Sequence, residues 1–228
     1  WFHPAHNNIA PKSVTLGTAS MRVFLLAALA AVPLTTLPPA VPAFAADAPT
    51  QTLRIALRED ADMLDPTLAR TYVGRIVFAG LCDKLFDIDA KLNIVPQLAT
   101  GYQWTDSKTL VIKLRDGVTF QDGEKMDAEA VKYSLLRHLN MPGSSRRAEI
   151  AGMESIDVID PLTVRITLKA PNAPFLAALT DRAGMIVSPK AAEAEGKDFA
   201  LHPVCAGPYK FTERVSQDRI VLDRFPGY

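Results

Sequence analysis

Apolar and polar residues follow two different periods along the chain. Residues 53–57, 110–114 and 164–168 alternate strictly, as half-buried β-strands do. Residues 156–158 alternate too, and the Asp160-Pro161 turn predicts a hairpin between that strand and the next. A further hairpin is expected from Glu213 onward. Helical spacing of apolar residues predicts helices over residues 72–86, 175–180 and 190–195.

The longest continuous pattern runs from residue 101 to residue 136. After the strand at 110–114, the Asp-Gly pairs at 116–117 and 122–123 predict two tight turns, because Gly tolerates the positive φ such turns need. Asp127 then suits the cap of a helix, since its carboxylate accepts a free backbone N–H. Val131, Leu135 and Leu139 fall on one face of that helix.

Residues 21–45 have the pattern of a secretory signal peptide. Met21 and Arg22 precede an unbroken apolar run at 23–32, and Ala43-Phe44-Ala45 fits the small-x-small cleavage rule. A transmembrane anchor is the alternative, but a span needs about 20 apolar residues and Pro33 interrupts this run. We expect residues 1–20 to be sequence upstream of the start, and the mature chain to begin at Ala46 or a neighbour.

The charges argue against several classes of function. Lys and Arg number 25, Asp and Glu also 25, and no basic run forms the stripe that nucleic-acid binding favours. The four His do not cluster, and no zinc-protease, hydrolase or phosphate-loop motif occurs. We therefore expect no catalytic residue, no metal site and no cofactor. Cys82 and Cys205 are the only thiols: a disulfide is possible, but two separately buried thiols are favoured.

The pattern across residues 96–134 resembles the signature of the family 5 extracytoplasmic solute-binding proteins of ABC importers. The matching residues are Pro96, Leu98, Ala99, Trp104, Leu110, Ile112, Leu114, Arg115, Gly117, Val118, Phe120, Asp122, Gly123, Ala128, Val131 and Ser134. The chain departs from the family pattern at Asp106-Ser107 and at Ala130. A second landmark, residues 203–211, matches at Gly207, Pro208, Tyr209 and Phe211, with Cys205 and Ala206 in place of the usual Gly and Thr.

The resemblance implies a mixed α/β fold of the two-lobe, type II periplasmic-binding-protein kind. Residues 46–90 and 190–228 would be two segments of the first lobe, and residues 91–189 an inserted α+β subdomain. The family has a second lobe, so we expect this chain to hold only the first lobe and its insertion. Gly207, Pro208 and Tyr209 would lie near the hinge.

The resemblance also indicates candidate ligand residues, each with a simpler alternative. Arg182 would grip a ligand carboxylate with its planar fork, or else pair with Asp181. Asp60 and Asp62 would meet a ligand ammonium group, or else bond their own loop. Met63 and Tyr72 would line a cleft or belong to the core, and the core is favoured.

By resemblance, the protein is a soluble periplasmic receptor that binds a di- or oligopeptide, or a peptide-like solute such as glutathione, and delivers it to a membrane permease. We expect a monomer without a lipid anchor, because no Cys stands near the cleavage site. A secreted hydrolase and a chaperone-like peptide-binding module are the rival interpretations.

Overall fold

A four-stranded antiparallel sheet dominates the part of the chain that the structure describes. The computed structural model describes residues 51–228, of which Leu53–Tyr228 form one unit. The predicted upstream segment and signal peptide lie outside the described residues. The sheet has the order β3-β4-β6-β5, with bounds β3 (Ala99–Trp104), β4 (Thr109–Leu114), β5 (Met153–Asp160) and β6 (Thr163–Leu168). The predicted strand at 110–114 and the hairpin across Asp160-Pro161 are confirmed.

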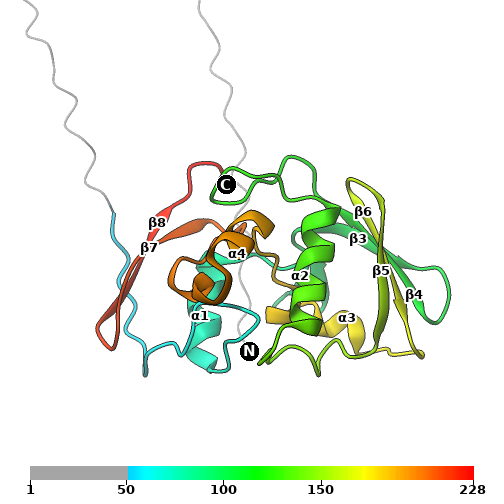
Figure 1. Cartoon of the computed structure of the whole chain (residues 1–228), viewed down its shortest axis with the longest axis horizontal. Coiled ribbons are helices and arrows are strands. Elements are labelled where there is room, and N and C mark those ends of the chain that lie inside the picture. The colour runs from blue at the N-terminus through cyan, green and yellow to red at the C-terminus, as the bar shows by residue number, and fades with distance from the viewer. Residues whose placement is uncertain (1–50) are drawn as a thin grey trace, which may run out of the picture. The chain divides into compact units, whose positions relative to one another are not determined.

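Helix α2 (Ala128–Asn140) covers one face of this sheet (Figure 1). The register pairs Leu110 with Ile166, so the apolar side chains of neighbouring strands lie in rows on that face. Val131 and Leu135 of α2 are fully buried in the same apolar cluster. The interior of this layer therefore includes apolar side chains that the strand period and the helix period had both marked.

The start of α2 has the predicted chemistry. The Asp127 carboxylate accepts a hydrogen bond from the Ala130 N–H at 3.0 Å, and Glu129 lies in the first turn, where a negative charge is favourable. Gly117 and Gly123 both have positive φ, 74° and 87°, so both predicted Asp-Gly turns are confirmed.

Shorter elements make up the rest of the fold. Two are hairpins, one of β1 with β2 and one of β7 with β8. Helix α1 contacts β7, and α4 contacts α2. Within residues 51–228 no helix is long and apolar enough to cross a membrane. The bounds are α1 (Tyr72–Leu81), β1 (Phe86–Ile88), β2 (Ile94–Pro96), α3 (Phe175–Ala178), η1 (Arg182–Gly184), α4 (Pro189–Glu195), η2 (Gly196–Leu201), β7 (Tyr209–Val215) and β8 (Arg219–Arg224).

The prediction of a first strand at 53–57 is wrong for the structure described. These residues are extended but unpaired, and Leu53 and Ile55 are 82% and 62% exposed. Alternation shows only that one face of a segment is apolar. A strand also needs a backbone partner, and β7 pairs with β8 instead.

The helix predicted over residues 72–86 ends earlier, at Leu81. Cys82 adopts an extended backbone, and the Leu85 N–H donates to the Gly184 carbonyl at 2.8 Å. Leu85 is buried in the large apolar cluster beneath the four-stranded sheet, not on a helical face. Tertiary bonding therefore overrides the helical spacing in the last turn.

Cys82 and Cys205 form a disulfide, which corrects the expectation of two separate thiols. Their Cα atoms are 4.9 Å apart, although 123 positions separate them in the sequence. The Gly207 N–H donates to the Leu81 carbonyl at 3.1 Å, which holds the two segments side by side. The spacing of the two cysteines in the sequence gives no indication of this backbone contact. The disulfide therefore could not be predicted from the sequence.

Gln121 joins the same two segments to the loop before α2. Its amide nitrogen donates to the carbonyls of Leu81 and Tyr209, each at 2.8 Å, and to that of Gly207 at 3.3 Å. Its amide oxygen accepts the Cys205 N–H at 2.9 Å. One side chain thus fixes the three chain segments that meet at the predicted hinge. The role of the hinge residues and the predicted domain boundaries stay predictions.

Candidate functional site

The loop before α1 is held in shape by its own aspartates. The Asp62 carboxylate accepts the Arg70 N–H at 2.8 Å and the Thr71 hydroxyl at 2.9 Å. Burial opposes ionisation of Asp62, but these hydrogen bonds outweigh it and lower its pKa. Asp60 accepts the Gln217 N–H at 3.1 Å and an Arg214 N–H at 3.0 Å. Both bonds lower the pKa of Asp60, and the bond from Gln217 has the larger effect.

The same loop is docked on α2 by a buried ion pair. Asp65 is 1% exposed and takes two hydrogen bonds from Arg137, at 2.8 and 2.7 Å. Thr67 lies 2.8 Å from Nδ1 of His138, whose Nε2 lies 3.0 Å from the Met185 carbonyl oxygen. Burial lowers the pKa of His138 to about 4, so the imidazole is neutral. His138 is therefore a packed residue of α2.

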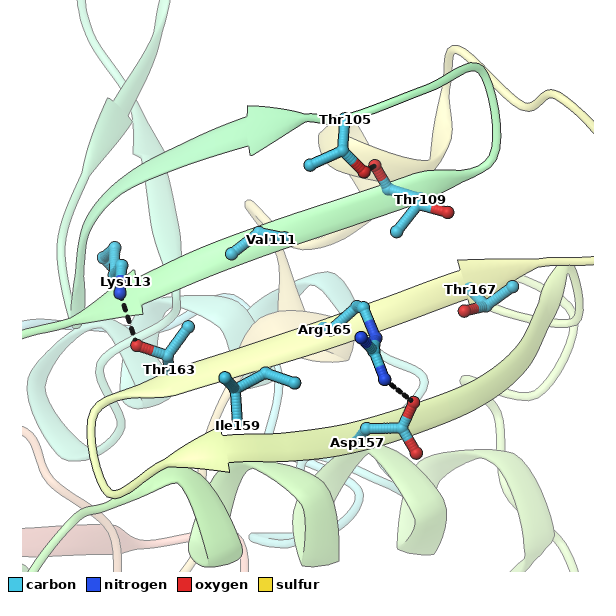
Figure 2. Close-up of a pocket in the computed structure, with 9 residues that line it drawn as sticks. All are labelled: Thr105, Thr109, Val111, Lys113, Asp157, Ile159, Thr163, Arg165 and Thr167. Atoms are coloured by element: carbon cyan, nitrogen blue, oxygen red, sulfur yellow. Dashed lines mark hydrogen bonds and ion pairs between the residues drawn. The ribbon is translucent and has the colours of Figure 1, made fainter.

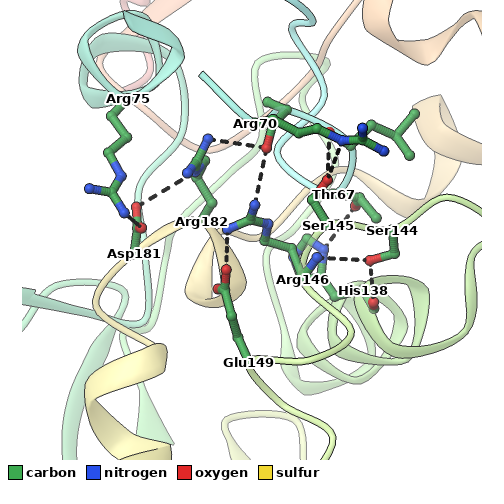
Figure 3. Close-up of polar contacts among 12 residues, drawn as sticks. Thr67, Arg70, Arg75, His138, Ser144, Ser145, Arg146, Glu149, Asp181 and Arg182 are labelled. Atoms are coloured by element: carbon green, nitrogen blue, oxygen red, sulfur yellow. Dashed lines mark hydrogen bonds and ion pairs between the residues drawn. The ribbon is translucent and has the colours of Figure 1, made fainter. Parts of the chain in front are cut away.

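Two buried arginines converge on the end of this loop (Figure 3). Arg146 and Arg182 are 4% and 5% exposed, and each donates to the Ala69 carbonyl at 3.1 Å. Arg182 also donates to the Thr71 carbonyl at 3.1 Å. The Nε atoms of both arginines are buried and have no hydrogen-bond partner within the described residues. The two guanidinium groups therefore fix the entry of α1 and keep unused donor capacity.

The charges around the two arginines do not cancel. Glu149 accepts from Arg146 at 2.5 Å. Asp181 lies 3.9 Å from Nε of Arg182 and also pairs with Arg75. Three guanidinium groups thus face two carboxylates. Burial, and then the charge of Arg146, lower the pKa of Arg182, while burial raises the pKa of Glu149. The cluster of Arg75, Arg146, Arg182, Glu149 and Asp181, named here the arginine cluster, contains one guanidinium group more than it has carboxylates.

Two exposed apolar side chains lie near the start of α1, one in the loop before it and one in its first turn. Tyr72 is 71% exposed and Met63 42%, so the expectation that both belong to the core is wrong. The guanidinium of Arg75 lies 5.9 Å from the centre of the Tyr72 ring, within cation–π range. The start of α1 therefore presents an aromatic ring beside a cation that belongs to the arginine cluster.

A separate shallow hollow of about 580 Å³ lies on the face of the sheet opposite α2 (Figure 2). It is lined largely by threonines and by charged residues that already bond one another: Lys113 to Thr163 at 2.7 Å, and Arg165 to Asp157 at 3.1 Å. It shares no residue with the arginine cluster. Because its charged groups are exposed and mutually paired, we regard it as solvated sheet surface.

The structure brings only some of the predicted ligand residues together. Arg182 lies in the arginine cluster, and Asp62 holds the adjacent Arg70–Thr71 backbone. Asp60 lies apart from them, against the turn between β7 and β8. No group of three His, Cys, Asp or Glu side chains within residues 51–228 is placed to hold a metal ion.

Arg146, Glu149 and Arg75 were missed by the sequence interpretation. Arg146 and Glu149 lie in a polar stretch between α2 and β5, where charged residues normally face water. Arg146 is buried against the carbonyl of Ala69, 77 positions away in the sequence. No local signal in the sequence predicts it.

Comparison with known proteins places the chain in a family. The model of the bacterial extracellular solute-binding proteins, family 5 Middle, matches residues 93–228. The glutathione-binding protein GsiB of Salmonella paratyphi A is 36% identical over 176 residues, 76% of this chain and 34% of that protein. GsiB of Escherichia coli O1:K1 is 33% identical over the same length. The chain thus spans about a third of the length of the curated relatives it matches.

Solved structures agree with this assignment. A nickel ABC transporter structure from Bacillus halodurans is 34% identical, with a TM-score of 0.63 over 72% of this chain and 33% of that one. The periplasmic binding protein DppA from Helicobacter pylori, solved with the peptide STSA, is 27% identical, with a TM-score of 0.66 over 75% and 38%. The predicted mixed α/β fold of type II periplasmic binding proteins is therefore confirmed for this part of a lobe. The chain belongs to the bacterial extracellular solute-binding proteins of family 5.

Proposed function

We propose that this protein is a periplasmic receptor of an ABC importer, and that it binds a small peptide or a peptide-like solute such as glutathione. It hands the solute to permease subunits in the inner membrane and acts as a monomer. The role needs no covalent chemistry. Family membership supports the receptor class, and the names of the GsiB relatives and the peptide bound to DppA support the solute class.

The observation that carries the solute class is the arginine cluster. Peptides and glutathione carry carboxylates at neutral pH, and a guanidinium group is the side chain best shaped to hold one. Arg146 and Arg182 each keep a buried Nε donor without a partner, in a cluster with one guanidinium in excess. A solute carboxylate supplies both the missing charge and acceptors for unused guanidinium donors.

The surrounding residues have distinct proposed roles. Arg182 anchors the carboxylate, and Tyr72 and Met63 form an apolar wall beside it. Asp62 is retained as a candidate for a ligand ammonium group, although in this structure it bonds Arg70 and Thr71. Asp60 is a weaker candidate, because Gln217 and Arg214 already occupy its carboxylate. Gly207, Pro208 and Tyr209 are proposed as the hinge.

The test is a titration of the chain with reduced glutathione and with glycylglycine, followed by NMR so that weak binding is measured. Arg182→Ala should weaken binding of both by roughly 1.5–3 kcal/mol, the scale of a charge-assisted hydrogen bond. Arg165→Ala, in the exposed pair with Asp157, is the matched control and should bind like the unaltered chain. Unchanged affinity in a folded Arg182→Ala protein would show that Arg182 only stabilises the loop before α1 and does not contact the solute. Absence of binding to either probe by the unaltered chain would contradict the proposed solute class.

A further inference from the structure

The position of Glu149 in the arginine cluster has a consequence for ligand binding. Among the described residues, its carboxylate is the one within hydrogen-bond distance of the two buried arginines, at 2.5 Å from Arg146. Asp181 is too far from Arg182 for a hydrogen bond, at 3.9 Å, and is shared with Arg75. Glu149 therefore occupies the guanidinium edge of Arg146 that a carboxylate would otherwise take.

The two acids are more exposed to solvent than the two arginines that they accompany. The side chains of Arg146 and Arg182 are 4% and 6% exposed, whereas those of Glu149 and Asp181 are 35% and 28% exposed. A carboxylate arriving from solution thus meets the internal carboxylates before it meets the guanidinium groups. Figure 3 shows the Glu149 carboxylate on the Arg146 guanidinium.

The bond between Glu149 and Arg146 is well formed but is one that can be exchanged. A partly exposed ion pair is worth little, because water competes for both partners. The charged groups that face Glu149 are Arg146 on its own segment, and Asp181 and Arg182 at the start of η1. Burial opposes the ionisation of Glu149, the charge of Arg146 favours it, and the charge of Asp181 opposes it.

We propose that Glu149 is an internal counter-ion that a solute carboxylate replaces on Arg146, so that Glu149 sets the affinity of the site for carboxylates. This rests on the proposed function in naming a carboxylate-bearing solute. The exchange swaps one carboxylate for another at the same guanidinium edge, and no covalent bond changes. Arg146 then contacts the solute carboxylate beside Arg182, which keeps its hydrogen bonds to the Ala69 and Thr71 carbonyls.

Two effects follow. Neutralising Glu149 removes the competitor, so Glu149→Gln should bind carboxylates about two- to fivefold more tightly, the scale of a partly exposed ion pair. Protonation of Glu149, whose pKa is raised by burial, has the same effect, so the affinity of the unaltered chain should rise as the pH falls into the range where Glu149 takes up its proton. Glu149→Gln should lose this pH dependence.

The experiment uses formate as the probe, because it offers a carboxylate and nothing else of a peptide. The arginine Nε–H signals of the 228-residue chain are followed by ¹H–¹⁵N NMR at constant ionic strength, with chloride as the competing anion. Arg146→Lys and Arg182→Lys assign the two signals. Asp157→Asn is the matched control, because it removes one acid from an exposed pair with Arg165 outside the cluster.

The expected result is that formate shifts the Arg146 signal, at lower concentration in Glu149→Gln than in the unaltered chain or in Asp157→Asn. Equal formate affinity in the unaltered chain and Glu149→Gln would overturn the proposal, as would an equal gain in Asp157→Asn. No response to formate in any variant would overturn it too. A parallel titration with reduced glutathione tests only the proposed solute class. A negative result there would leave the proposed role of Glu149 to be decided by the formate titration.

Discussion

His138 shows how a single buried residue orders several segments. Arg137 donates to the Thr67 hydroxyl, that hydroxyl donates to Nδ1 of His138, and Nε2–H of His138 donates to the Met185 carbonyl. This chain of donors requires the neutral imidazole, since a proton on Nδ1 would face the Thr67 hydrogen. One ring thereby connects α2 with the loop before α1 and with the segment after η1.

The first prediction is that stability falls on mild acidification because of His138. Its pKa is about 4 in the folded chain, against about 6.5 when unfolded, so the unfolded state binds the proton more readily. The contribution is complete above about pH 6.5 and is lost as the pH falls toward 4, up to about 3 kcal/mol. Urea unfolding at about pH 7.5 and 5 should therefore differ by about 2 kcal/mol. His138→Gln keeps a donor and an acceptor without titrating, and a pH slope as steep as that of the unaltered chain would refute this assignment.

The second prediction concerns the ion pair between Asp65 and Arg137. Asp65→Asn leaves a guanidinium that is 9% exposed without its counter-charge, which should cost about 3–5 kcal/mol of unfolding free energy. Asp157→Asn in the exposed pair with Arg165 should cost less than about 1 kcal/mol. Chemical denaturation of both variants measures the difference. Similar losses in the two would mean that burial does not govern the strength of these pairs.

At the scale of elements, the sequence predicted those features that depend only on residues close together in the chain. The Asp127 cap, the two Asp-Gly turns and the β5–β6 hairpin each depend on neighbours in sequence, and all were predictable. The end of α1 was not, because Leu85 bonds to Gly184, about a hundred positions away. The same holds for the candidate site: Arg182 could be suspected from its type, but the burial of Arg146 depends on a distant carbonyl.

The third prediction tests the backbone contact between the end of α1 and the segment before β7. A Cβ on Gly207 would lie 2.5 Å from the carbonyl carbon and oxygen of Leu81, and backbone atoms cannot move aside as a flexible side chain can. Gly207→Ala should therefore destabilise the fold by at least about 1–3 kcal/mol. Gly101→Ala, with no atom within 4 Å of the added carbon, should lose less than about 1 kcal/mol. Thermal unfolding of both variants gives the answer, and equal melting temperatures would contradict it.

At the scale of the whole described unit, three separate apolar clusters must be held together. The largest lies between the four-stranded sheet and α2, and two smaller ones involve α1 with the segments around η2 and β8. Gln121, next to Phe120 of the largest cluster, bonds Leu81 and Cys205 of the second cluster, and Phe211 and Leu222 pack against both smaller clusters. Hydrophobic periodicity identifies the clusters, but it carries no information about the links between them.

The fourth prediction is that the disulfide contributes strongly to global stability. A cross-link between residues 123 positions apart restricts the unfolded chain, for which loop-closure estimates give about 3–5 kcal/mol. Reductant should lower the free energy of unfolding of the unaltered chain by that amount, and with it the denaturation midpoint. The Cys82→Ala/Cys205→Ala double variant should start lower and be insensitive to reductant. A midpoint unchanged by full reduction would show that the segments are held by Gln121 and Gly207 alone.

The bridge also has a mechanical consequence. Because Cys82 and Cys205 are covalently joined, a force applied to the two chain ends bypasses everything between them. The ring closed by the disulfide contains 123 residue steps, so roughly 400 Å of chain, at about 3.3 Å per residue, cannot be extended while the bond is intact. The sheet β3-β4-β6-β5 and α2 lie inside this ring and stay unloaded under tension. In a pulling experiment their extension should become visible only after the sulfur–sulfur bond is cut.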